Sequence, residues 1–389
     1  MAAAAQVIPQ SPTKTSRTPE FDLLCACCRH DASSAVLAAL CSETAWDRVL
    51  TLASHHRVLP QLCSALRRNN EVLASIQSAL HSSFSAHNRR VLRFTAQLVA
   101  ILRQFQTHGI EAILHKGPAL AQRLYNDALM REFGDLDFLI RAKDIPRAGE
   151  ALCELGFRPH LQLSSRQERA YLRTGYEYAF TSDLGPNLIE LQWQIVPRFY
   201  SIAFQPEELF QRSVEIEFEG QSARILKDED LLLALCVHAA KHCWAQLGML
   251  RDIAALARRP IDWQWIAAKA RQLGIVRILT ASLVLSRNLL GSELPSEFAV
   301  NPELQQSEKF AGIIQKQMIR GGEPDTESLD YFRFMMRLRE SWRHRLLFAK
   351  RLAFTPGVSE WNSIRLPDAL FPLYRGIRVL RLFKRAFSF

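Results

Sequence analysis

The sequence predicts an α+β fold in which a small mixed β-sheet core is flanked by N-terminal and C-terminal helical regions. Apolar residues recur at spacings of three and four up to residue 109 and again after residue 227, which is typical of helices. Between these limits, short apolar runs alternate with polar residues and glycine-containing turns, which is typical of strands. The chain has 389 residues, enough for roughly two or three hydrophobic cores.

The chain divides into five segments. Residues 1–20 are rich in Ala, Ser, Thr and Pro and have no charged stretch leading into an apolar run, so we expect a disordered leader rather than a signal peptide. The other four segments are a helical region over 21–109, an α/β core over 110–227, a helical domain over 228–325 and a basic helical region over 326–389.

The elements within these segments follow from local patterns. In the core we expect strands over 112–114, 135–140, 176–181, 188–195, 214–218 and 223–226, and helices over 118–125 and 143–155. Pro118 suits the first turn of its helix, and Gly156 ends the other. After the core we expect helices over 228–244, 249–258, 263–273, 276–290 and 331–354, with a weak pattern containing a loop over 295–325.

Composition excludes several classes of protein. With 48% hydrophobic and 23% charged residues, the chain is neither disordered nor collagen-like, and it is no disulfide scaffold. No stretch approaches the roughly 18 to 20 apolar residues of a membrane span. Eight cysteines without a secretory signal suggest reduced thiols, so we expect a cytoplasmic protein.

The positive charge is concentrated near the C-terminus. The chain carries 49 Lys and Arg against 39 Asp and Glu, a net charge of +10, and residues 320–389 alone hold 14 basic against 7 acidic residues. Basic and apolar residues interleave there, which predicts a basic amphipathic helix. Its arginines either pair with acids elsewhere, or contact an anionic membrane surface or a protein partner, or contact nucleic acid. Nucleic acid is the least favoured of these partners, because clustered Lys and Gly are absent.

Two groups of cysteine and histidine are possible zinc ligands: Cys25, Cys27, Cys28 and His30, and Cys236, His238, His242 and Cys243. The first group has no second ligand pair nearby, so we favour buried or half-buried thiols on a helix. In the second group the two histidines share one helical face, but Ala239 stands where a metalloprotease has Glu. A packed helix face is therefore favoured there, with zinc or a place at the edge of an active site as alternatives.

Three acidic residues on predicted strands point to metal chemistry. Asp135 and Asp137 are two residues apart, so both side chains point to the same face of a strand, and Glu190 lies between apolar residues on another strand. Adjacent carboxylates repel each other unless they are compensated, and Mg²⁺ prefers such hard oxygen ligands. A solvated strand face is the alternative. Three carboxylates on two strands suffice to hold two metal ions.

Two basic residues near these acids are candidates for phosphate binding. Lys116 and Gly117 lie where a strand ends and a helix begins, and a helix N-terminus favours anions. Arg131 either binds phosphate through its guanidinium group or forms an ion pair with a nearby acid or strand. His115 is expected to be structural, and Asp252 either interacts with a helix N-terminus or completes a substrate pocket.

These motifs resemble the uncharacterised nucleotidyltransferase family of the DNA polymerase β superfamily. The resemblance covers about 110–258 and rests on Lys116-Gly117, Arg131, the segment 134–140 and later segments at 188–193 and 231–252. It implies a metal-dependent enzyme that moves a nucleoside monophosphate from an NTP to a hydroxyl or phosphate of an unidentified small-molecule or protein acceptor, releasing pyrophosphate.

The resemblance also implies a role for each site residue. Asp135, Asp137 and Glu190 would be catalytic and would hold two Mg²⁺ ions, and Lys116, Gly117 and Arg131 would bind the nucleotide. Two positions depart from the family pattern, because Pro118 follows Gly117 where Gly or Ser is usual, and Gln192 stands where His is frequent. Alternatives are a non-catalytic nucleotide-binding or regulatory protein on the same fold, and a membrane-surface or assembly factor acting through the basic C-terminus.

Overall fold

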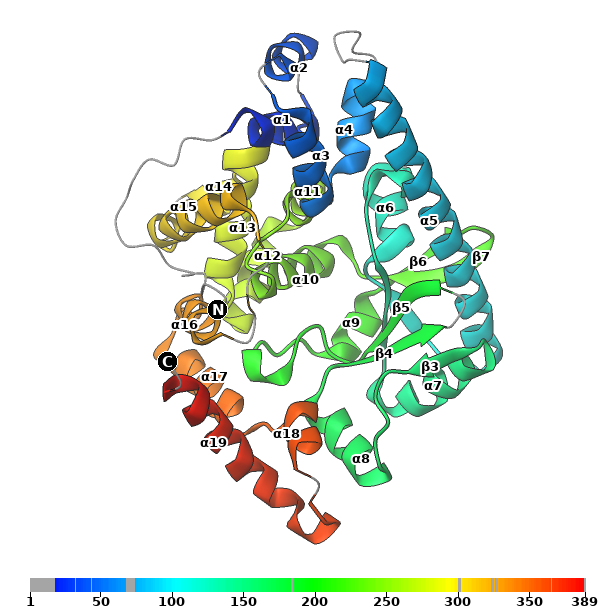
Figure 1. The fold of residues 1–389 in the computed structure, drawn as a ribbon. Helices are drawn as coiled ribbons and strands as arrows, with labels where there is room; N and C mark the ends of the chain where they lie inside the picture. The colour runs from blue at the N-terminus through cyan, green and yellow to red at the C-terminus, as the bar shows by residue number, and fades with distance from the viewer. Residues whose placement is uncertain are drawn as a thin grey trace.

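The computed structural model describes residues 18–31, 33–42, 44–67, 74–182, 185–299, 302–322, 325, 328–364 and 366–387. The predicted leader lies outside the described residues up to residue 17, and the first helix begins at Pro19. The fold is α+β, as predicted, with a mixed sheet set among helices (Figure 1).

A seven-stranded mixed sheet forms the centre of the described fold, with strand order β3-β4-β5-β2-β1-β7-β6. The parallel pairs are β2 with β5 and β1 with β7, and the other neighbours run antiparallel. The strands are β1 (Ala112–Leu114), β2 (Asp135–Ile140), β3 (Phe157–Pro159), β4 (Glu177–Ser182), β5 (Gly185–Gln192), β6 (Val214–Phe218) and β7 (Gln221–Ile225).

One face of the sheet is covered by the long helix α5 (Ala74–Thr107), which runs beside the sheet in Figure 1. The ring of Phe105 meets that of Phe138 edge-on with centroids 5.4 Å apart, and Phe94 meets Phe133 at 5.3 Å. The other N-terminal helices are α1 (Pro19–Cys28), α2 (Ser34–Cys41), α3 (Trp46–His55) and α4 (Leu59–Leu66). They pack into the other core, with the helices that follow the sheet.

That second core covers the opposite face of the sheet. Leu139 of β2 belongs to this core, whereas Leu136, Phe138 and Ile140 belong to the core of α5. Because strand side chains alternate, Asp135 and Asp137 share the face of Leu139. The helices on this side are α6 (Gly117–Tyr125), α10 (Asp228–Lys241), α11 (Leu247–Ala257), α12 (Trp263–Leu273) and α13 (Val276–Leu290).

Several elements differ from the sequence-based predictions. The helix expected over 228–244 ends at Lys241, because Cys243 and Trp244 adopt left-handed backbone conformations with φ near +50°. The helix expected over 331–354 is two helices, α16 (Leu329–Arg337) and α17 (Trp342–Phe354). The hydroxyl of Ser341 accepts a hydrogen bond from the backbone N–H of His344, and this cap starts α17 afresh.

Other elements were not predicted from the sequence. The weak stretch after residue 295 contains α14 (Ser296–Ala299) and the regular helix α15 (Leu304–Arg320). Short helices that connect the strands were also missed: α8 (Ser165–Thr174), α9 (Pro206–Arg212) and the 3₁₀ turns η1 (Ala128–Met130), η2 (Ala142–Asp144) and η3 (Arg198–Tyr200). These segments are short and mostly polar, so they contain too few apolar residues to show a helical repeat.

The C-terminal region continues with α18 (Val358–Ser363), the 3₁₀ turn η4 (Asp368–Leu373) and α19 (Tyr374–Phe387). Arg378 and Arg381 of α19 both form ion pairs with the buried carboxylate of Glu360, as the first interpretation of this helix predicted. Across the described ranges, no helix combines the length and apolar character needed to cross a membrane.

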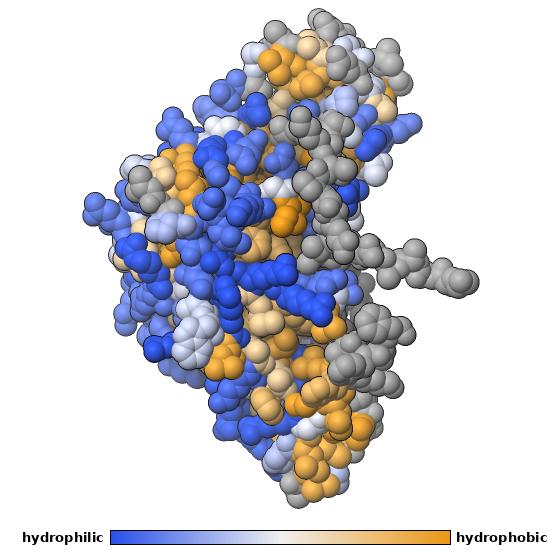
Figure 2. All heavy atoms as spheres, turned by 90° about the vertical axis from the view of Figure 1, so that its left-hand side faces the viewer, coloured by the Kyte–Doolittle hydropathy of each residue, from blue (hydrophilic) through white to orange (hydrophobic). Residues whose placement is uncertain are grey.

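Apolar side chains remain exposed in this C-terminal region. Figure 2 shows apolar atoms gathered at the lower end of one face of the molecule, where α17 and α19 lie in Figure 1. The exposed residues include Trp342, Leu346 and Phe354 of α17, Leu370 and Leu373 of η4, and Leu380 and Phe383 of α19. We call these seven residues the C-terminal apolar surface.

Candidate active site

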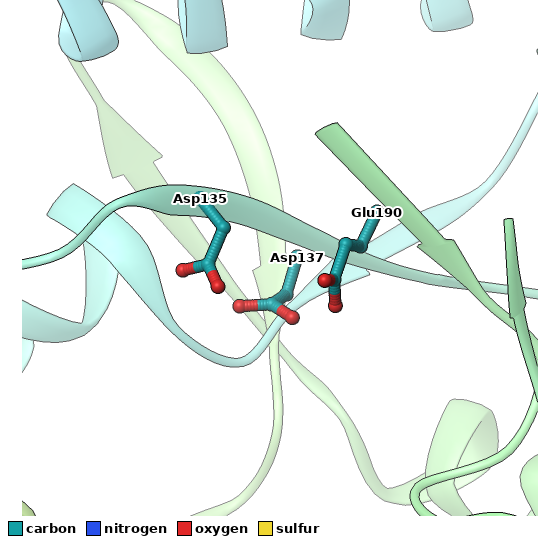
Figure 3. A group of neighbouring side chains, drawn as sticks. All are labelled: Asp135, Asp137 and Glu190. Atoms are coloured by element: carbon teal, nitrogen blue, oxygen red, sulfur yellow. The ribbon is translucent and has the colours of Figure 1, made fainter. Parts of the chain in front are cut away.

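Three carboxylates converge on the sheet face that carries Asp135 and Asp137. Strands β2 and β5 run parallel, and their register places Asp137 directly opposite Glu190. One oxygen from each of Asp135, Asp137 and Glu190 lies within 4.8 Å of the others. All three side chains point to the same side of the sheet (Figure 3). We call these three residues the acidic cluster.

Two neighbouring side chains partly compensate the acidic cluster. The Oδ1 atom of Asp137 accepts hydrogen bonds from the ammonium group of Lys116 at 3.2 Å and from the amide of Gln192 at 2.7 Å. The same amide also donates to Glu190 at 2.9 Å. Asp137 is only 2% exposed, yet its second oxygen, Oδ2, is buried without a hydrogen-bond partner among the described residues. A buried carboxylate oxygen without a partner costs free energy.

The charges of the cluster act on one another. Burial, together with the nearby carboxylates of Asp137 and Glu177, raises the pKa of Glu190 to about 9. Burial and the charge of Asp137 likewise raise the pKa of Asp135. Burial works to lower the pKa of Lys116, but the three carboxylates outweigh it and raise that pKa. The site therefore concentrates more negative charge than Lys116 alone offsets.

The residues of the cluster fit a divalent metal ion. Hard cations such as Mg²⁺ bind carboxylate oxygens, and the partnerless Oδ2 atom of Asp137 is an acceptor that such a cation would satisfy. In the described part of the chain, this is the one cluster of acidic, histidine or cysteine side chains close enough to share an ion. The two predicted cysteine–histidine groups do not form such clusters there. As favoured from the sequence, Cys25, Cys27 and Cys28 are buried or half-buried thiols on α1, and Cys236 and Cys243 are also buried.

Gly117 begins α6 beside the acidic cluster. Its φ of +71° lies in the left-handed region, which favours glycine, and an added Cβ would stand 3.3 Å from the Cδ2 atom of Leu136. Pro118 occupies the first turn, where its missing N–H would have no partner within the helix. The helix N-terminus that the sequence predicted is therefore present at the end of β1, next to Lys116 and Asp137.

Arg131 forms an ion pair with a partner that the sequence did not suggest. Its guanidinium group donates to the Oδ2 atom of Asp252 at 2.8 Å, and the hydroxyl of Tyr125 donates to Oδ1 at 2.6 Å. Asp252 lies on α11, so this pair joins the core to the second helical core. Arg131 and Asp252 also line a pocket together with His238 and Arg251.

Three histidines near the site are held neutral by their surroundings. Burial and the charge of Lys116 lower the pKa of His115 and of His238 well below the usual range. Burial, followed by the charge of Lys241, lowers the pKa of His242 to about 3. The rings of His238 and His242 lie 4.7 Å apart on the end of α10, as their spacing of four residues predicted.

Two residues near the cluster were missed from the sequence. Glu177 on β4 is paired in register with Gln192 and contributes to the raised pKa of Glu190. Lys241 donates from its ammonium group to the hydroxyl of Tyr176 at 2.8 Å, and burial lowers its pKa. Glu177 begins its strand and Lys241 ends a helix 64 positions later. No sequence spacing therefore indicated that either residue lies near the acidic cluster.

The class of this protein is that of the nucleotidyltransferases, as the sequence resemblance implied. Residues 42–291 match the family described as uncharacterised nucleotidyltransferase, and the chain belongs to that family. No protein among the curated ones matches the chain.

Two solved structures resemble the chain in part. One is the crystal structure of JHP933 from Helicobacter pylori, with 15% identity over 59% of this chain and 93% of that chain, at a TM-score of 0.27. The other is described as "putative nucleotidyltransferase from H. pylori", with 15% identity over 59% of this chain and 96% of that chain, at a TM-score of 0.28. Likeness at this level carries no weight for function.

Proposed function

We propose that this protein is a metal-dependent nucleotidyltransferase that moves a nucleoside monophosphate from an NTP to a hydroxyl or phosphate of an unidentified acceptor. The observation that carries the proposal is the acidic cluster on two adjacent parallel strands, with its buried and partnerless Asp137 oxygen. Membership of the nucleotidyltransferase family supports the same reaction class.

In the proposed reaction, an oxygen of the acceptor forms a bond to the α-phosphorus of the NTP. The bond from that phosphorus to the oxygen bridging to the β-phosphate breaks, and pyrophosphate leaves. Asp135, Asp137 and Glu190 would hold two Mg²⁺ ions, which would neutralise phosphate charge and activate the acceptor oxygen. Glu190 would also orient the acceptor group or take its proton, while the Gln192 amide holds the carboxylates of Asp137 and Glu190 in place.

Lys116, Gly117 and Arg131 would bind the nucleotide. Lys116 forms an ion pair with Asp137 in this structure, and with a cation at Asp137 its ammonium group would be available to the β- and γ-phosphates. The backbone at Gly117 lets those phosphates approach the N-terminus of α6 closely. Arg131 lines a small neighbouring pocket, and its guanidinium group would contribute positive charge to the nucleotide from there.

The experiment is incubation of the protein with each labelled NTP, Mg²⁺ and cell extract, followed by tracing of the label. We expect label to enter one acceptor with the wild-type protein and transfer to fall by about 10²-fold or more with Asp137→Asn. Glu150→Gln removes an exposed acid of α7 (Ile145–Glu154) in the same core and serves as the matched control, with unchanged transfer expected. No transfer with any NTP would contradict an enzymatic role.

The same variants test the non-catalytic alternative, a nucleotide-binding or regulatory protein. Gln192 motivates it, because an amide cannot act as an acid or base near neutral pH. Binding of a fluorescent ATP analogue in Mg²⁺, lost in Asp137→Asn but without any label transfer by the wild type, would favour this alternative over the enzyme.

A second candidate function concerns the C-terminal apolar surface. In the sequences of α17 and α19 these residues alternate with basic ones, and apolar residues among basic ones suit an anionic membrane surface. We propose that this surface binds anionic phospholipid. Sedimentation with phosphatidylcholine vesicles, with and without phosphatidylserine, tests it: binding that depends on phosphatidylserine is expected, and equal or absent binding would contradict it.

A further inference from the structure

A second pocket lies just past the carboxyl end of β5. Three arginines from separate segments line it: Arg173 at the end of α8, Arg198 at the start of η3, and Arg351 on α17. The other lining residues are apolar or uncharged, so no acidic side chain lines this pocket. We call it the arginine pocket. It joins the sheet core to the C-terminal helical region.

The positive charge of the arginine pocket is not compensated within the described structure. None of the three guanidinium groups has a carboxylate within 4.0 Å among the described residues, whereas many other arginines there have such a partner. Arg198 donates a hydrogen bond to the carbonyl of Arg173 at 3.2 Å, and Arg351 donates to the carbonyl of Arg198 at 3.3 Å. These bonds hold the three segments together, but carbonyls do not neutralise the charges.

The charges also act on one another. Burial and then the charge of Arg198 lower the pKa of Arg351, which is the expected effect of a nearby like charge. Arg173 and Arg198 are exposed, so water screens part of the repulsion, and an anion between the groups would relieve the rest. The arginine pocket gathers positive charges, just as the acidic cluster gathers negative ones.

A buried donor without an acceptor lies beside this pocket. Trp193 lines the pocket and is 2% exposed, and its indole N–H is buried without a hydrogen-bond partner among the described residues. A buried indole N–H usually finds a partner. Three arginines therefore line a pocket without an acidic residue among its described lining, and an indole N–H without an acceptor is buried beside it.

We propose that the arginine pocket binds a phosphate group carried by the acceptor of the nucleotidyltransferase reaction. A phosphate monoester has three terminal oxygens and close to two negative charges, which matches several guanidinium groups. A carboxylate has one charge and two oxygens, which a single arginine satisfies.

Because of where the pocket lies, we assign the bound phosphate to the acceptor and not to the NTP. This assignment rests on the proposed function. Gln194 lines the pocket only two residues after Gln192, which contacts both Asp137 and Glu190. Two residues span about 7 Å of extended chain, so the pocket begins close to the acidic cluster. Gly117 and Arg131, the proposed nucleotide-binding residues, do not line it. A phosphate held there would tether a second molecule beside the nucleotide.

The first experiment measures binding of inorganic phosphate by isothermal titration calorimetry in buffer with EDTA, so that metal-bound phosphate does not contribute. We expect the wild-type protein to bind phosphate and Arg198→Gln to bind it about tenfold more weakly. Arg173→Gln should show a similar loss. Lys350→Gln, which removes one charge from an exposed neighbour of Arg351 on α17, is the matched control and should bind as the wild type does.

Two results would contradict the proposal that the arginine pocket binds phosphate. One is the absence of measurable phosphate binding by the wild type, and the other is equal binding by the wild type and both arginine variants. Asp137→Asn, tested in the same metal-free buffer, should leave phosphate binding unchanged. Loss of binding in that variant would place the phosphate elsewhere and would also overturn the proposal.

The second experiment tests the assignment to the acceptor, using label transfer in cell extract. With Arg198→Gln, we expect about tenfold more extract to be needed for half-maximal transfer, while the NTP concentration for half-maximal transfer stays the same. A change in the NTP dependence alone would assign the pocket to the nucleotide and overturn the acceptor assignment. If the wild type transfers no label, the proposed function fails and the acceptor assignment fails with it. The calorimetric result judges the pocket independently.

Discussion

The acidic cluster and the arginine pocket each gather like charges, but the protein builds them differently. The acidic cluster stands on two neighbouring strands whose register is fixed by backbone hydrogen bonds, and Lys116 and Gln192 partly compensate it. The arginine pocket is assembled from a helix end, a turn and a C-terminal helix, and no carboxylate of the described residues compensates it. Fully buried charge needs partners within the protein, whereas charge at a more open junction can await a ligand.

The largest difference between the two regions should be their contribution to stability. Lys116→Met leaves the buried carboxylate of Asp137 without its cation, so we expect a loss of roughly 3–5 kcal/mol in the free energy of unfolding. Arg198 is exposed and has no ionic partner, so Arg198→Gln should change it by about 0.5 kcal/mol or less. Urea unfolding of both variants without metal measures this. Equal losses would show that the two regions are built alike.

The second prediction is that His56 makes the folded protein less stable at acidic pH. Burial, followed by the charge of His55, lowers the pKa of His56 to about 4, from 6.5 in the unfolded chain. Between these values the unfolded state binds a proton that the folded state does not, so stability falls as the pH drops from 6.5 to 4. At pH 4 the loss from His56 amounts to about 3 kcal/mol. Above pH 6.5 it vanishes.

His56→Leu checks this by urea unfolding at pH 7 and at pH 4. The variant should lose less stability on acidification than the wild type does. His55→Leu, which replaces the adjacent histidine, is the control and should retain most of the acid sensitivity. An unchanged pH dependence in His56→Leu would mean that His56 titrates normally in the folded protein. Binding measurements for both regions belong near neutral pH in either case.

The third prediction concerns Mg²⁺. A cation that binds only the folded acidic cluster stabilises it, by about 2.7 kcal/mol when its concentration is 100 times the dissociation constant. Thermal unfolding with increasing Mg²⁺ should therefore show a rising Tm that Asp137→Asn abolishes. Glu150→Gln should respond as the wild type does. An equal rise in Asp137→Asn would place the ion outside the acidic cluster.

A fourth and smaller effect is expected at the C-terminal apolar surface, which differs from the arginine pocket in exposing apolar side chains. Leu380 is 71% exposed, so Leu380→Glu should leave the fold intact. It should weaken sedimentation with phosphatidylserine vesicles several-fold, because it removes apolar contact and adds a repelled charge. Leu92→Glu changes an exposed leucine of α5 and is the control. Equal weakening by the control would show a non-specific effect of charge.

The smallest expected effect is the coupling between the two regions without substrates. The double variant Asp137→Asn with Arg198→Gln should change the free energy of unfolding by the sum of the single changes, within about 0.5 kcal/mol. Urea unfolding of the four proteins forms the cycle. A larger coupling would mean that the acidic cluster and the arginine pocket stabilise each other.

The two regions also differ in how far the sequence predicted them. Strand β2 matches its predicted range, because alternation of acidic and apolar residues over 135–140 reports strand geometry directly. The helices α12 and α13 likewise match their predicted ranges. The face shared by Asp135 and Asp137 follows from that alternation. Their proximity to Glu190 depends on how β2 and β5 pair, which the resemblance suggested and periodicity alone did not.

Contacts between distant segments escaped sequence reasoning. Arg131 pairs with Asp252, 121 positions away, rather than with the nearby acids considered at first. The arginine pocket draws on positions 173, 198 and 351, which share no local pattern. The helix break at Ser341 was missed because the basic and apolar alternation continues through it. Local periodicity reports local structure, whereas these contacts depend on how helices dock against the sheet.

The place of Arg351 on α17 has a consequence for synthesis of the chain. The acidic cluster is complete once residue 190 has left the ribosome, but the arginine pocket gains its third guanidinium group only with residue 351. A nascent chain that stops between these points has all the carboxylates for a metal ion and lacks part of the proposed phosphate site. Translation order thus delays the proposed recognition of the acceptor until most of the protein exists.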